Sequence, residues 1–167
     1  LMNLPEGFEE KDVSLSDLSL ADAWILNRLN QTIAHVTANM EKYEFALVGN
    51  ELYSFVWNDF CSSYIEFTKS TLLGDDEKAK KKTLDTLIYV LTAILKLLHP
   101  FIPFVTEEIY QAIYGREVSI CKETWPEIMP ADENKASNID SLNEVIRTVR
   151  DIKTENNIKP SKEIQIE

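Results

Sequence analysis

Glycine, cysteine and histidine are scarce in this sequence of 167 residues, which contains four, two and two of them. Without a glycine-rich loop there is no backbone cradle for phosphate, so no nucleotide site is expected. His35 and His99 have no serine or cysteine at an informative spacing, so both are expected to be structural. Cys61 and Cys121 form no Cys-x-x-Cys motif and predict no metal site. We expect two buried, reduced thiols, with a disulfide between them as the alternative.

Basic residues and long apolar runs are also few. Lysine and arginine number 17 against 28 acidic residues, and the net charge of −11 argues against unspecific affinity for nucleic acid. No apolar run reaches the roughly 18 residues of a membrane span, and LMNLPEGFEE lacks the features of a signal peptide. We therefore expect a monomeric, cytoplasmic protein that does not enter a membrane. Leu1 is not an initiator and the chain stops within an alternating stretch, which predicts a fragment of a larger protein.

What is abundant is helical periodicity. Hydrophobic residues make up 44% and charged residues 27%, the balance of a soluble globular domain. The clearest pattern covers residues 84–113, where an apolar stripe predicts a long helix at the centre of a bundle. Its members are Leu84, Leu87, Ile88, Leu91, Ile94, Leu95 and Leu98. Pro100 ends this helix, and Pro103 suits the first turn of the next. The predicted fold class is therefore all-α, a helical bundle.

The remaining elements follow from the same period and from capping signals. Ser19 and Asp22 form a capping pattern before a helix that runs to about Glu44. The other predicted elements are a helix at 45–72, an extended segment near 116–130 that Trp125 fixes on the bundle, a helix at 137–157 and the start of a strand at 163–167. We divide the chain into a connection (1–19), a helical bundle (20–157) and the start of a truncated α/β subdomain (158–167).

One late helix carries a basic stripe in this otherwise acidic chain. Arg147, Arg150 and Lys153 recur every three residues, and Lys159 and Lys162 follow. A basic stripe on one helix is the footprint expected for a phosphate backbone. Basic residues near the end of a helix are equally well explained by the helix dipole. From the residues alone, the chain is a helical binding or scaffolding module without catalytic residues.

Three blocks of sequence carry a resemblance to a known family. ADAWILNRLN, LYSFVWNDFCSSYIEFTK and LLHPFIPFVTEEIYQAI occur in this order in class I aminoacyl-tRNA synthetases for branched aliphatic amino acids. The second block is most similar to the valyl members of that family. EVIRTVRDIKTENNIKPSKEI is similar to the segment that leaves their helical bundle. The resemblance covers the chain from about Leu20 to Glu167.

This resemblance implies an anticodon-binding helical domain. The family's catalytic signatures are absent, so the resemblance implies a parent enzyme that ligates valine to its tRNA with ATP and magnesium, and a fragment that holds no catalytic residue or cofactor. The implied partners are the cognate valine tRNA and an upstream catalytic domain. Predicted tRNA contacts are Asn27, Arg28, Arg147, Arg150 and Lys153. Trp57, Tyr64 and Phe101 are assigned to core or domain packing.

Two alternatives stay open at this point. The same domain type also belongs to the isoleucyl- and leucyl-tRNA synthetases, because the amino-acid pocket lies elsewhere in the enzyme. A helical protein-interaction module without any role in RNA binding would also suit the acidic balance.

Overall fold

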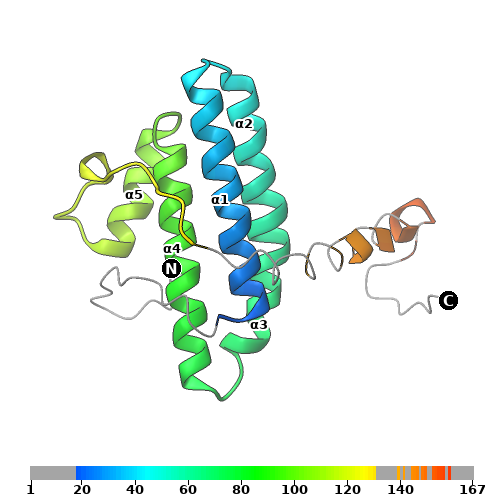
Figure 1. Cartoon of the computed structure of the whole chain (residues 1–167). Coiled ribbons are helices and arrows are strands. Elements are labelled where there is room, and N and C mark those ends of the chain that lie inside the picture. Colours follow the sequence, from blue (N-terminus) through cyan, green and yellow to red (C-terminus); the bar gives the residue numbers. More distant parts are fainter. Residues whose placement is uncertain are drawn as a thin grey trace.

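The computed structural model of this chain is an assembly of helices (Figure 1). It describes residues 18–130 and, beyond them, 139, 141, 144–146, 148–149, 152–156 and 158. The elements are α1 (Leu20–Glu41), α2 (Phe45–Ser54), a π-helix η1 (Phe55–Tyr64), α3 (Ile65–Leu72), α4 (Glu77–Leu98), α5 (Pro103–Tyr114) and a 3-10 helix η2 (Ile120–Lys122). No strand occurs among these described residues, which confirms the all-α prediction. None of the helices described is long and apolar enough to cross a membrane.

The helix ends lie close to where the capping residues predicted them. The Ser19 side chain accepts a hydrogen bond from the backbone N–H of Asp22, and Asp76 caps α4 in the same way. Pro103 occupies the first turn of α5, as predicted. Helix α1 ends at Glu41 and not near Glu44. Tyr43 adopts a φ of 60°, the left-handed region, so the helix cannot continue through that residue.

The predicted helix at 45–72 is continuous, but its middle turns are those of a π-helix. Two serines support this register, since Ser62 and Ser63 donate hydrogen bonds to the carbonyls five residues before them, at 2.7 and 3.0 Å. On an α-helix Val48 and Tyr64 would point about 160° apart at 100° per residue. The wider turns of η1 bring both side chains to the same face, where each is fully buried. The π-helix therefore allows one continuous rod to bury a single face.

Helix α4 lies at the centre, as predicted, and separates two hydrophobic clusters. One wall of α4 packs with α1 and with α2 and η1, and it includes Val90, Ile94 and Leu97. The opposite wall contributes Ile88 and Leu95 to a smaller cluster with α5 and η2. This arrangement explains why the sequence of α4 is apolar nearly all round.

The segment after α5 crosses the bundle as a strap. We use this name for residues 116–130, which run from α5 across α4 to α1 (Figure 1, yellow). Lys96 pairs with Glu123 at 2.9 Å, and the Trp125 indole N–H donates to the Thr37 hydroxyl at 2.9 Å. The Asn30 side chain exchanges two hydrogen bonds with the backbone of Met129. The prediction of an extended segment fixed by its indole is confirmed, with the short helix η2 added.

Several burial predictions are wrong. Trp57 is 59% exposed and Phe101 is 40% exposed, so neither lies in the core, and packing against another domain stays a prediction for both. Tyr64 is fully buried as predicted. Both cysteines are free, which rules out the disulfide, but both are exposed and not buried. Periodicity locates a face of a helix, yet it does not show whether a neighbour covers that face.

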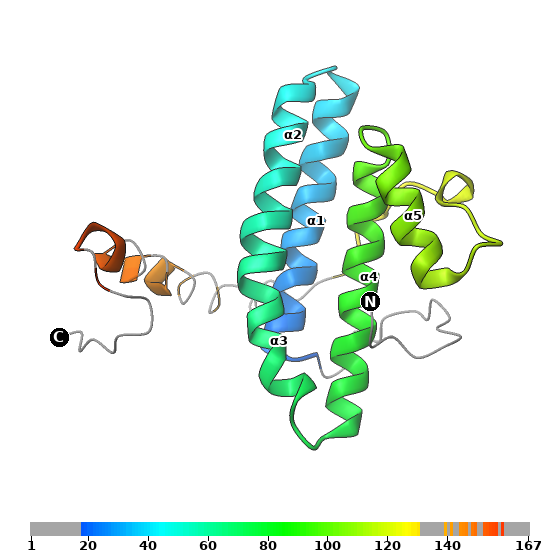
Figure 2. The same ribbon diagram turned by 180° about the vertical axis from the view of Figure 1, so that it is seen from behind.

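Other predictions lie outside the described residues. These are the side chains of Arg147 and Arg150, the connection at 1–17 and the strand at 163–167. Described residues between 139 and 155 are helical, in agreement with the predicted last helix. They lie out to the side of the bundle beyond α2 and α3 (Figures 1 and 2).

Candidate nucleic-acid interface

Arg28 is the predicted tRNA contact whose position differs most from expectation. Its Nε and Nη2 donate to one oxygen of Asp59 at 3.0 and 2.8 Å, and Nη1 donates to Gln31 at 2.6 Å. The Asp59 side chain is only 6% exposed and that of Arg28 is 30% exposed. Two charges withdrawn from water in this way need each other, so the guanidinium holds η1 against α1. The open position expected for Arg28 is therefore corrected to an ion pair between helices.

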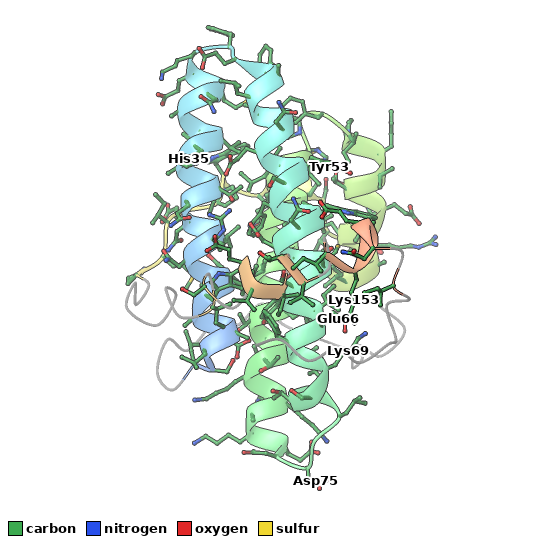
Figure 3. All side chains as sticks on the ribbon, turned by 90° about the vertical axis from the view of Figure 1, so that its right-hand side faces the viewer. His35, Tyr53, Glu66, Lys69, Asp75 and Lys153 are labelled. Atoms are coloured by element: carbon green, nitrogen blue, oxygen red, sulfur yellow. The ribbon has the colours of Figure 1, made fainter. Side chains whose placement is uncertain are left out.

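Asn27 and Lys153 are both partly exposed, so water and ligands reach each of them. Asn27 lies on α1 next to Arg28. Lys153 lies in the last helical stretch, on the side of the molecule seen in Figure 3, where Tyr53 of α2 is also found. The structure therefore places Lys153, one of the predicted basic contacts, beyond the outer face of the continuous helical rod that α2, η1 and α3 form.

Tyr53 and Trp57 form an exposed aromatic pair on that rod. Their rings are stacked with an interplanar angle of 10° and centroids 6.4 Å apart. Tyr53 is 68% exposed and Trp57 is 59% exposed. Aromatic faces that are open to water are surfaces on which unstacked RNA bases bind. Trp57 was expected in core or domain packing, although its spacing of four from Tyr53 already places the two side chains next to each other on a helix.

A buried carboxylate fixes the helices behind this surface. Asp22 is 1% exposed and accepts hydrogen bonds from the hydroxyls of Ser19, Tyr64 and Thr83 at 2.7, 2.7 and 3.1 Å. These donors come from the start of α1, from η1 and from α4, so one side chain joins three helices. Burial raises the pKa of Tyr64, and the charge and hydrogen bond of Asp22 raise it further. Tyr64 is therefore a neutral hydrogen-bond donor to Asp22 at neutral pH.

The two histidines differ in their surroundings. His35 is exposed, with Nδ1 3.4 Å from a carboxylate oxygen of Glu51. His99 has closer partners, the Thr106 hydroxyl at 2.8 Å and the Cys121 thiol at 3.2 Å. No serine or cysteine stands at an informative spacing from His99 in the sequence, but the fold brings Cys121 to it. The contact joins residues far apart in sequence, and their spacing gave no signal of it.

Comparison with known proteins agrees with this helical architecture. Residues 22–167 match a family described as "Anticodon-binding domain of tRNA ligase". The "Valine--tRNA ligase" of Staphylococcus aureus (strain MRSA252) is 47% identical over 169 residues, which cover 99% of this chain and 19% of that protein. The "Valine--tRNA ligase" of Bacillus subtilis (strain 168) is 46% identical, and the match again covers 99% of this chain and 19% of the relative. This chain thus spans about a fifth of the length of these relatives. The chain belongs to the family of anticodon-binding domains of tRNA ligases.

Proposed function

We propose that this chain is the anticodon-binding part of a valine–tRNA ligase and holds the anticodon stem and loop of valine tRNA. The observation that carries the proposal is the family match over residues 22–167, together with relatives that are named as valine–tRNA ligases. These names favour valine over isoleucine and leucine. In the whole enzyme, acting in the cytoplasm, an upstream catalytic domain would use ATP and magnesium, and the described part of this chain would supply binding alone.

The surface described above suits a folded RNA with an open loop. Loop bases would stack on the Tyr53–Trp57 pair, and Arg147, Arg150 and Lys153 would meet phosphates. Asn27 offers hydrogen bonds to base edges or sugars. Arg28 is already bonded to Asp59 and Gln31, so we assign it to positioning η1 and not to a phosphate. The net charge of −11 limits binding of other RNAs away from this surface.

An exposed apolar patch supports a place within a longer enzyme. Tyr43, Phe45 and Phe101 contact each other in series, edge to face, and Phe104, three residues after Phe101 in the sequence, is 89% exposed. We call these four residues the corner patch. Exposed aromatic residues gathered in this way mark a protein interface. In our proposal the catalytic domain of the same enzyme covers the corner patch, so the interaction surface and the RNA surface are different parts of one domain.

Binding of a synthetic hairpin with the anticodon stem and loop of valine tRNA tests the proposal. The whole chain should bind it more tightly than the same hairpin with an isoleucine anticodon. Trp57→Ala should remove about 1–3 kcal/mol of stacking, which is about a 5- to 150-fold rise in Kd. Arg147→Ala with Arg150→Ala should weaken binding and lower the slope of log K against log salt by about 1.4–1.8.

The matched control removes two lysines from the exposed start of α4. Lys78→Ala with Lys81→Ala changes the net charge by the same amount as the double arginine variant. It should leave the salt slope unchanged, because the proposed surface includes no residue of α4. Equal binding of both hairpins, with no loss in any variant, would refute anticodon binding and favour the protein-interaction module. In the full-length enzyme, the arginine variants should lower tRNA charging but leave pyrophosphate exchange intact.

A further inference from the structure

Three residues with metal-binding side chains meet where α4, α5 and η2 come together. His99 caps the end of α4, Glu107 lies on α5 and Cys121 lies in η2. One imidazole nitrogen, one carboxylate oxygen and the sulfur all lie within 4.8 Å of one another. His99 and Glu107 are partly exposed and Cys121 is exposed, so an ion from solvent can reach them. None of these three residues belongs to the RNA surface proposed above.

The hydrogen bonds around His99 fix which ring nitrogen is available. The Thr106 hydroxyl donates to the backbone carbonyls of Ile102 and Pro103, at 3.0 Å each. Its oxygen therefore accepts the bond from His99, so Nδ1 carries the proton at 2.8 Å from Thr106. The lone pair of Nε2 is then directed at the Cys121 sulfur, 3.2 Å away. Histidines that bind metals are held in this way, by a partner on the other ring nitrogen.

Glu107 is held just as firmly beside this pair. Its Oε1 accepts a hydrogen bond from Gln111 at 2.7 Å. Its Oε2 accepts two longer bonds, from the Ser119 hydroxyl and the Ile120 backbone N–H, both at 3.2 Å. A carboxylate has about four lone-pair positions, so capacity for a metal remains after these three bonds. The carboxylate is thus already oriented before any ion arrives.

We propose that His99, Glu107 and Cys121 form a zinc site, with water as the fourth ligand. Thiolate, imidazole and carboxylate together favour Zn²⁺ over magnesium or calcium. Zn–S and Zn–N bonds at a tetrahedral angle place the two donor atoms about 3.6 Å apart. The present separation of 3.2 Å needs only a small adjustment. A Zn²⁺ ion bound by a thiolate, a carboxylate and a neutral imidazole would leave the site with no net charge.

The untagged, EDTA-treated chain provides the test, with Co²⁺ and Zn²⁺ as probes. Cobalt should bind with a stoichiometry of one and give a thiolate-to-metal charge-transfer band, and zinc should displace it. Zinc should also raise the Tm, because at a free concentration c it stabilises the folded chain by RT ln(1 + c/Kd). Cys121→Ser should abolish the charge-transfer band and weaken zinc binding at least tenfold. Thr106→Val should weaken it about 10- to 100-fold by releasing the His99 ring.

The chain contains its own matched controls, because it has two cysteines and two histidines. Cys61→Ser and His35→Asn should leave binding and spectrum unchanged. Cys121→Ser changes an exposed residue, so it should remain folded, which helical circular dichroism checks. Zinc should protect Cys121 but not Cys61 from alkylation, as read by mass spectrometry.

Two results would overturn the zinc site. One is the absence of a cobalt–thiolate band in the folded chain, or a band that survives Cys121→Ser. The other is rapid alkylation of Cys121 that saturating zinc does not slow. That second result would leave Cys121 and His99 as a reactive thiol and its base.

Discussion

Replacing Tyr64 with phenylalanine tests whether the buried Asp22 carboxylate holds the bundle together. The substitution removes one hydroxyl from a fully buried side chain and leaves the ring in place. Asp22 then loses its 2.7 Å hydrogen bond from Tyr64 and keeps those from Ser19 and Thr83. Because Asp22 is 1% exposed, water cannot easily replace the missing donor.

The cost follows from the charge on the acceptor. A hydrogen bond to a charged group contributes about 1.5–3 kcal/mol, more than one between neutral groups. In a chain of this length, that loss lowers the Tm by about 3–12 °C. Urea unfolding followed by circular dichroism should show a lower midpoint with an unchanged m-value, because the exposed surface does not change.

Tyr53→Phe is the control for the chemistry of the substitution. Tyr53 is 68% exposed, so the free energy of unfolding of the Tyr53→Phe variant should stay within about 0.5 kcal/mol of that of the parent chain. If Tyr64→Phe also stays within that margin, Asp22 does not depend on the tyrosine and the reasoning fails. A double-mutant cycle with Thr83→Val measures whether the donors act together.

Further predictions concern two glycines and one ion pair. An added Cβ meets nothing within 4 Å at either Gly49 or Gly115, but Gly115 has a φ of 101°. Gly49→Ala should therefore raise the free energy of unfolding by about 0.5–1 kcal/mol. Gly115→Ala should lower it by about 1–3 kcal/mol. If urea unfolding shows both variants to be stabilised, or both destabilised, this reasoning is contradicted. The hydrogen bond from Lys96 lowers the pKa of Glu123. The contribution of this ion pair to stability is thus fully present above the ordinary glutamate pKa. It is lost as the pH falls through the lowered pKa of Glu123 in the folded chain. Lys96→Met should flatten acid unfolding curves in that range, and an unchanged curve would argue against the pair.

Local patterns were enough to predict most of the architecture. The period of α4, the cap at Ser19 and the prolines at the corner depend on nearby residues, and each has its predicted role. The family resemblance supplied the class of binding site, which the basic stripe alone left undecided.

Features that depend on distant contacts were missed. The pairing of Arg28 with Asp59 joins residues 31 positions apart, so neither side chain shows its partner locally. The meeting of His99 with Cys121 likewise requires the strap to fold back, which composition does not reveal. One further miss is local: the turns of η1 are wider than those of an α-helix, as the bonds of Ser62 and Ser63 to carbonyls five residues back reflect, and no α-helical period reports that shift.

The position of α4 between two hydrophobic clusters has a consequence for local opening. Helix α5 and η2 contribute to the smaller cluster only, and the larger one is complete without them. A fluctuation that releases α5 therefore strips one wall of α4 and leaves its other wall packed. Backbone amides of α5 should then exchange with deuterium before those of α1. The domain can therefore open locally at α5 while the helices of the larger cluster stay folded.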